Sequence, residues 1–85
     1  MHEKSIECYT KYISKNPNKY FAFNNRGLQF EKIGQYENAI SDFKKSIELI
    51  ASSKENDNEE RLNRSKRNLL RVESILISQN DDLPF

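Results

Sequence analysis

The sequence is poor in the residues that most often carry covalent or metal chemistry. Its 85 residues include one cysteine, Cys8, and one histidine, His2. One cysteine excludes a disulfide within the chain, and these two side chains are too few to assemble a metal site. No serine or carboxylate is recognisably placed to form a catalytic relay with them. We therefore expect no cofactor and no enzymatic activity.

Long apolar runs and a strong net charge are also missing. The N-terminal segment lacks the continuous apolar stretch of a secretory signal, and no segment is long enough to span a bilayer. We therefore expect a cytoplasmic protein without a membrane segment. Fourteen Lys and Arg against thirteen Asp and Glu leave a net charge of +1, so any basic site for nucleic acid must be local.

The chain has the composition of a small helical domain, which we place over residues 1–85. Hydrophobic residues make up 35% and charged residues 32%, while glycine and proline number two each. Apolar residues recur at three- and four-residue steps, as in Ile6, Tyr9 and Ile13, which is the spacing of one helical face. This periodicity predicts four helices, over about residues 3–15, 19–33, 36–51 and 57–79.

Three breaks separate the predicted helices. Asn16 is a candidate N-cap for the second helix, with Pro17 opening that helix. Gly34 and the following glutamine predict a tight turn. Asp57, followed three residues later by Glu60, resembles a variant of the capping box at the start of the fourth helix.

The chain also repeats itself at an offset of 34 residues, which is the period of a helix-turn-helix solenoid. The offset pairs Ile6 with Ile40, Tyr9 with Phe43, Lys11 with Lys45, and Ile13 with Ile47.

Residues 23–49 resemble the tetratricopeptide repeat. Its aromatic and small slots are filled by Phe23, Gly27, Phe30, Ala39 and Phe43, with Gly34 and Tyr36 at the turn. The sequence departs from the family at Arg26, where leucine is common, and at Ala51, where the closing proline would be. Ser5, Tyr9, Tyr12 and Pro17 fit the second half of a preceding repeat, so the resemblance covers residues 5–51. The alternative is an ordinary helical hairpin with aromatic core residues.

The resemblance implies an all-α fold of helical hairpins, a fragment of a right-handed superhelix with a longer C-terminal capping helix. It also implies a protein-interaction module, since the first helix of each repeat lines a groove for a partner's peptide. The groove candidates are Phe21, Asn24, Asn25, Leu28, Glu31 and Lys32. Only Asn25 falls in the family's slot for binding a C-terminal carboxylate, so we do not expect chaperone binding. The alternative is that the asparagines are solvated and Leu28 belongs to the core.

The fourth predicted helix carries two further features. A basic cluster, Arg61, Arg64, Lys66, Arg67 and Arg71, allows an alternative function as a nucleic-acid accessory protein. Acidic neighbours dilute it and no aromatic residue interleaves, so we expect a solvated face rather than a nucleic-acid site. The second half of the helix is more apolar than a cap needs, at Leu69, Leu70, Val72, Ile75, Leu76 and Ile77.

We expect these apolar residues to form a homodimer interface. The first predicted helix, as the second half of a repeat, also lacks its own partner helix. The alternative is that the fourth helix folds back onto its own repeat and leaves a monomer.

Overall fold

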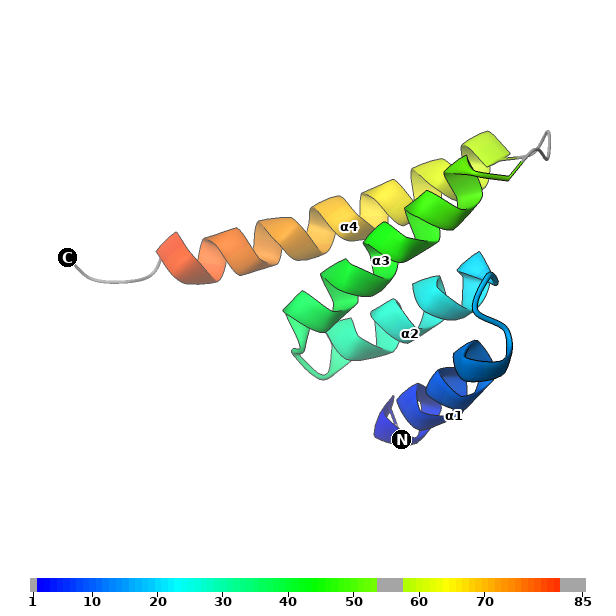
Figure 1. Ribbon diagram of the computed structural model, residues 1–85. Coiled ribbons are helices and arrows are strands. Elements are labelled where there is room, and N and C mark those ends of the chain that lie inside the picture. The colour runs from blue at the N-terminus through cyan, green and yellow to red at the C-terminus, as the bar shows by residue number, and fades with distance from the viewer. Residues whose placement is uncertain (1, 54–57, 82–85) are drawn as a thin grey trace.

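The computed structural model describes residues 2–53 and 58–81, and this part of the chain forms four helices. They are α1 (His2–Lys15), α2 (Tyr20–Lys32), α3 (Tyr36–Ala51) and α4 (Asn58–Asp81). Consecutive helices pack side by side, and the first part of α4 also reaches α2 (Figure 1). The predicted all-α fold is confirmed, and each helix begins and ends within two residues of its predicted bounds.

The connection between α1 and α2 differs from the prediction. Asn16 does not cap α2, because α2 begins at Tyr20 and is preceded by Lys19, whose side chain makes no capping hydrogen bond. Instead Asn16 closes α1. Its backbone N–H donates to the carbonyl of Tyr12 at 2.8 Å, and its side-chain amide donates to the same oxygen at 3.1 Å. The side chain of Asn16 thus adds a second hydrogen bond to the Tyr12 carbonyl at the end of α1, and Pro17 then turns the chain.

The predicted turn at Gly34 is confirmed. Gly34 has a φ of +80°, a left-handed conformation that glycine adopts without a steric penalty. The N–H of Gln35 donates to the carbonyl of Phe30 at 2.9 Å, and the N–H of Gly34 donates to Glu31 at 3.1 Å. This is the Schellman arrangement, which ends α2 and reverses the chain into α3.

The core lies where α2, α3 and α4 meet. Ala39, Phe43 and Val72 are completely buried, and five partly buried side chains pack around them: Leu28, Phe30, Tyr36, Ile40 and Leu69. Gly27 is essential to this packing, since a Cβ atom there would lie 2.8 Å from Cε1 of Phe43. The small residues expected at the crossing of α2 and α3 are therefore required by the approach of the two helices.

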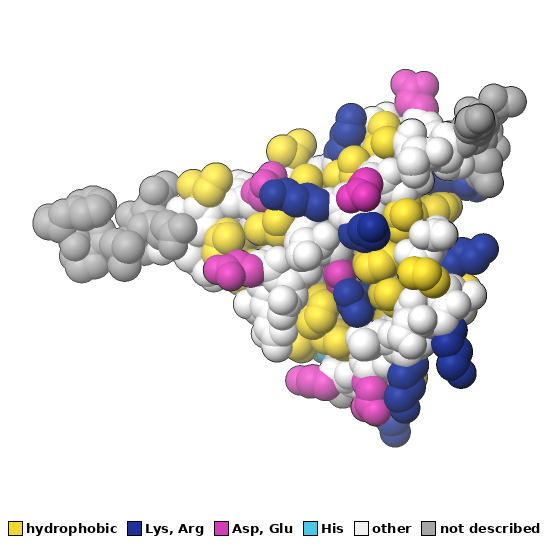
Figure 2. All heavy atoms as spheres, viewed as in Figure 1, with side chains coloured by type: hydrophobic (Ala, Val, Ile, Leu, Met, Phe, Trp, Pro, Cys, Tyr) yellow, Lys and Arg dark blue, Asp and Glu magenta, His cyan; other side chains and the backbone are white. Residues whose placement is uncertain are grey.

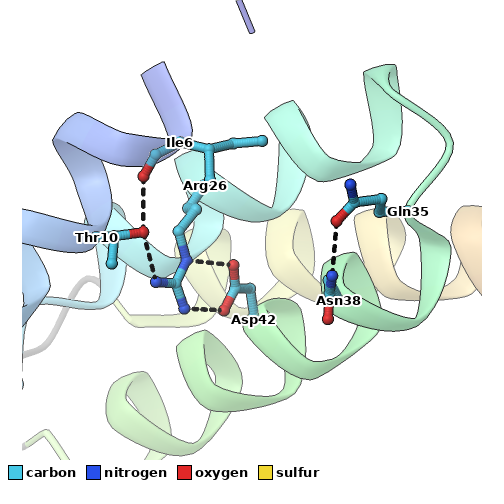
Figure 3. Close-up of polar contacts among 6 residues, drawn as sticks. All are labelled: Ile6, Thr10, Arg26, Gln35, Asn38 and Asp42. Carbon is cyan, nitrogen blue, oxygen red and sulfur yellow. Dashed lines mark hydrogen bonds and ion pairs between the residues drawn. The ribbon is translucent and has the colours of Figure 1, made fainter. Parts of the chain in front are cut away.

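Arg26, in the slot where leucine is common, lies among three helices. Its guanidinium donates two hydrogen bonds to Asp42 of α3 and one, from Nη1, to the hydroxyl of Thr10 of α1 at 3.1 Å (Figure 3). The rings of Phe23 and Phe30 lie 5.7 and 5.6 Å from its central carbon, within range of cation–π attraction. Hydrogen bonding to Asp42 raises the pKa of Arg26, so the guanidinium stays charged.

The start of α4 is tied to the end of α3. The side-chain amide of Asn58 donates to the carbonyls of Ile50 and Ser53, at 3.1 and 3.0 Å. Asp57 of the predicted capping box lies outside the described residues. At about 1.5 Å per residue, α4 with 24 residues is about 12 Å longer than α3 with 16. The end of α4 consequently extends past the turn between α2 and α3 (Figure 1).

Candidate functional site

A buried polar network fixes α4 against α2 and α3. The side-chain oxygen of Asn24 in α2 accepts hydrogen bonds from the Asn68 amide at 3.1 Å and the Ser65 hydroxyl at 3.3 Å. Ser65 in turn lies 3.0 Å from the hydroxyl of Ser46 in α3. Because Ser65 donates to Asn24, the Ser46 hydroxyl donates to Ser65. Among the described residues, every buried side-chain nitrogen and oxygen has a partner, so the network carries no uncompensated polar atom.

Beside this network, α2 and the first half of α4 form the two walls of an open cleft of about 1100 Å³. Most of the side chains that line it are polar: Tyr20, Phe21, Asn24, Asn25, Glu59, Glu60, Arg61, Asn63, Arg64, Ser65 and Arg67. Asn24 and Ser65 both line the cleft and belong to the network that joins the two helices, so the network helps to position the cleft.

Aromatic rings gather at the end of the cleft nearest α1. The ring of Phe21 lies 5.7 Å from that of Tyr12 in α1 and 6.2 Å, edge to face, from that of Tyr20. Arg61 of α4 reaches across and places its guanidinium carbon 5.6 Å from the Tyr20 ring. Phe21 is 42% exposed and Tyr12 38% exposed, which is unusual for large apolar side chains. The cleft therefore offers an accessible apolar contact beside its polar lining.

The remaining lining combines amides with both signs of charge. Asn25 of α2 and Asn63 of α4 each carry a group that donates and a group that accepts hydrogen bonds. Arg64 pairs with Glu60 of its own helix at 3.7 Å, and both side chains are largely exposed. Such a lining suits the N–H and C=O groups of an extended peptide better than a uniformly charged ligand.

The structure distributes the predicted groove residues among three environments. Phe21, Asn24 and Asn25 line the cleft. Leu28 packs against the core, as the alternative interpretation held. Glu31 accepts two hydrogen bonds from Arg71 of α4, at 2.6 and 2.8 Å, and Lys32 is exposed outside the cleft.

The sequence prediction considered Tyr20 as a partner-facing aromatic but expected it to pack against the first helix, and it considered Arg61, Arg64 and Arg67 only as a basic site. It did not place any residue of α4 beside the predicted groove. Periodicity identifies a helix face but not the helix that crosses it. The available signal was Ser65 and Asn68, two polar residues on the otherwise apolar stripe of Leu62, Leu69 and Val72. Polar residues on a buried stripe indicate a partner within the fold.

Much of the basic cluster on α4 is engaged within the chain. The Glu31 carboxylate binds Arg71 and raises its pKa through hydrogen bonding. Arg61 stacks on Tyr20 and Arg64 pairs with Glu60. The five cations therefore do not form one continuous basic face that is free to bind phosphates.

The six residues of the predicted oligomer interface also separate into groups. Val72 is completely buried and presents no surface to a second chain, which corrects the prediction for this residue. Leu69 is partly buried against the same core. Ile75 and Leu76 are half-buried. Leu70 and Ile77 remain exposed. This division follows from the folding of α4 back onto α3, which covers one side of the apolar stripe.

The residues first considered for chemistry, His2 and Cys8, do not line the cleft. His2 lies at the start of α1 and donates through Nδ1 to Gln29 at 2.7 Å, while Cys8 is exposed. Over residues 2–53 and 58–81, no three His, Cys, Asp or Glu side chains are grouped so that they could hold a metal ion. None of the described helices is both long and apolar enough to cross a bilayer.

Comparison with known proteins finds a similarity over the central helices. Residues 20–52 match the family model of the tetratricopeptide repeat. Among curated proteins, the small glutamine-rich tetratricopeptide repeat-containing protein 2 of Mycosarcoma maydis is 42% identical over 45 residues. The match covers 53% of this chain and 13% of that protein. No solved structure matches the chain significantly.

Proposed function

We propose that this chain is a protein-interaction module that holds an extended segment of a partner protein in the cleft between α2 and α4. The match of residues 20–52 to the tetratricopeptide repeat, whose family generally mediates protein–protein interaction, supports this proposal. The observation that carries the proposal is the combination of exposed Phe21 with the amides of Asn25 and Asn63 along one open cleft. Ligand sites commonly combine an aromatic side chain with a few polar groups in one concave surface, as this cleft does.

The mode of binding follows from the chemistry of the lining. The two amides donate to carbonyls and accept from N–H groups of the partner's backbone, which fixes an extended conformation. A hydrophobic side chain of the partner packs on Phe21 and Tyr12, whose rings already contact one another. Backbone contacts supply affinity and the aromatic contact supplies selectivity for an apolar residue in the partner.

The distribution of charge favours a protein partner over nucleic acid. Three of the five cations of the basic cluster, Arg61, Arg64 and Arg71, already interact with side chains of this chain. Carboxylates of Glu59 and Glu60 line the same cleft and would repel phosphates. We place the function in binding rather than catalysis, in keeping with the family to which the repeat belongs.

A selection from a random peptide library tests the proposal. We expect selected peptides to share an apolar residue and to shift the amide NMR signals of Phe21, Asn25 and Asn63. Phe21→Ser combined with Asn63→Ala should abolish their binding and leave helicity unchanged, whereas Lys32→Ala, outside the cleft, should bind normally. Asn24 is not a suitable target because it supports the fold.

Selected peptides that bind the double variant as well as the parent would exclude the cleft. Failure to select any peptide, with single-stranded nucleic acid bound in a strongly salt-dependent manner, would favour the nucleic-acid alternative.

A further inference from the structure

Two charged side chains of the cleft have no ionic partner within the described chain. Glu60 pairs with Arg64 at 3.7 Å, and Arg61 stacks on an aromatic ring. Glu59 and Arg67 line the same cleft and are exposed, and neither forms an ion pair or a side-chain hydrogen bond with another described residue. Over residues 2–53 and 58–81, the cleft therefore keeps one anion and one cation available to a ligand.

These two charges lie toward opposite ends of the cleft. The anion is two residues before Arg61, which stacks on Tyr20 at the start of α2. The cation is one residue before Asn68, which binds Asn24 further along α2. The two charges are eight residues apart, which is about 12 Å along the helix axis. The exposed ring of Phe21 belongs to the anionic end, because it contacts Tyr20 edge to face.

We propose that the cleft selects a partner segment with one cation and one carboxylate, about four residues apart, and with its apolar residue beside the cation. The inference rests on the proposed function, since it concerns the same cleft and the same extended segment. An extended chain advances about 3.3 Å per residue, so about four residues cover the distance from Glu59 to Arg67. The cation of the segment then lies at Glu59, its carboxylate at Arg67, and its apolar side chain on Phe21.

The two signs of charge in the cleft act against segments of a single sign. A uniformly acidic segment is attracted to Arg67 but meets Glu59 and Glu60 at the other end, and like charges at close range oppose association. A uniformly basic segment meets Arg64 and Arg67 in the same way. On the face of the molecule in Figure 2, acidic and basic side chains lie beside one another in the upper half. Selection therefore comes from local contacts at each end of the cleft rather than from a field of one sign.

The chain offers a matched control for each of the two charges. Glu59 lies in the first turn of α4, where a negative charge also favours the helix dipole. Glu37 has the same place in the first turn of α3, is exposed, and does not line the cleft. Lys66 is exposed beside Arg67 and likewise does not line the cleft. Comparison within each pair separates an effect of the cleft from an effect of net charge or of the helix dipole.

Fluorescence anisotropy of the full chain with a labelled peptide from the random library is the first test. Glu59→Gln and Arg67→Gln should each weaken binding about two- to fivefold, as expected for exposed ion pairs. Glu37→Gln and Lys66→Gln should bind the peptide as the parent does. A peptide whose carboxylate is replaced by an amide should bind the parent and Arg67→Gln equally, because the contact is already absent.

A charge-exchange experiment tests the order of the two charges. Glu59→Lys combined with Arg67→Glu keeps the net charge of the chain and reverses the two ends of the cleft. The double variant should prefer a peptide in which cation and carboxylate are exchanged, and the ratio of the two affinities should change by about tenfold or more relative to the parent. Turning the exchanged peptide end to end does not restore binding to the parent, because its apolar residue would then leave Phe21.

Three outcomes would overturn the inference. Peptides that bind in the cleft without any preference for the two charges would refute it and leave the proposed function standing. Equal losses of affinity in the cleft variants and in their controls would assign the effect to net charge and would also leave the proposed function standing. A library that yields no peptide dependent on Phe21 would refute the proposed function and this inference with it.

Discussion

The guanidinium of Arg26 holds the carboxylate of Asp42 through two parallel hydrogen bonds, 2.8 Å from Nε to Oδ2 and 2.7 Å from Nη2 to Oδ1. Side-chain exposures of 18% for Arg26 and 5% for Asp42 place the pair largely within the fold. In the repeat that residues 23–49 resemble, leucine is common at the slot of Arg26, so a charged pair stands here where an apolar contact is usual. Desolvation makes such a pair costly to break and only weakly stabilising as a whole.

Arg26→Leu should therefore destabilise the fold, although it introduces the residue that the family prefers. It leaves the Asp42 carboxylate buried without its partner, and we expect the free energy of unfolding to fall by about 2 to 4 kcal/mol. Combining Arg26→Leu with Asp42→Ala should recover most of that loss. Urea denaturation of the parent, both single variants and the double variant gives the coupling energy. An Arg26→Leu variant as stable as the parent would refute this account of the pair.

Gly27→Ala should destabilise the fold despite the better helix propensity of alanine. The new Cβ would lie 2.8 Å from Phe43 Cε1 and 3.2 Å from Asp42 Cβ, so α2 and α3 must move apart. We expect a net loss of about 1 to 2 kcal/mol by thermal denaturation, since overpacking outweighs a propensity gain of up to ~1 kcal/mol. Ser41→Ala, at an exposed position of α3, is the control and should be neutral or slightly stabilising. Equal effects of the two substitutions would contradict the close crossing.

Asn24→Leu and its neighbour Asn25→Leu make a matched pair. Asn24→Leu leaves the Ser65 hydroxyl and the Asn68 amide without their shared acceptor, and we expect a loss of about 2 to 4 kcal/mol. Asn25→Leu changes a half-exposed residue of the cleft and should alter stability by less than about 0.5 kcal/mol. Hydrogen exchange should show faster opening of α4 in the first variant only. Similar stability of both variants would show that the network does not hold α4.

Arg71→Gln should have a small effect that depends on salt. The pair with Glu31 joins α4 to α2, but Arg71 is exposed to solvent, and such pairs contribute about 0.2 to 1 kcal/mol. We expect the difference from the parent to disappear in molar salt, because screening removes the attraction between exposed charges. Arg67→Gln, an exposed change four residues earlier, should show no difference at either salt concentration. A loss that persists in molar salt would indicate lost packing instead.

The sequence was sufficient to predict the four helices and the crossing of α2 with α3. Both depend on local information: the spacing of apolar residues, and small residues placed one turn from aromatic ones. The role of Arg26 could not be predicted, because its meaning depends on Asp42, sixteen residues away on another helix. The sequence shows that Arg26 stands where leucine is common, but it does not show that Asp42 is the residue that pairs with it.

The cleft could be predicted only in part, for a related reason. The repeat pattern identified the face of α2 that carries Phe21, Asn24 and Asn25. The sequence of α4 does not follow the repeat pattern. The pattern therefore could not predict which residues of α4 lie against α2. Leu28 and Glu31 lie on the same face of α2 as Asn24, but core packing and Arg71 cover them.

The packing of α1 has a consequence for the dynamics of the molecule. No residue of α1 is fully buried, and its contacts are made with α2, where Thr10 binds Arg26 and His2 binds Gln29. Lifting α1 from α2 would break the hydrogen bonds of Thr10 and His2 and separate the rings of Tyr12 and Phe21, but it would leave the pair between Arg26 and Asp42 intact. The cost of that opening is therefore smaller than the cost of global unfolding, and α1 forms a separate unit of local stability. Backbone amides of α1 then exchange with solvent sooner than those of α3, so the fold opens progressively from its first helix.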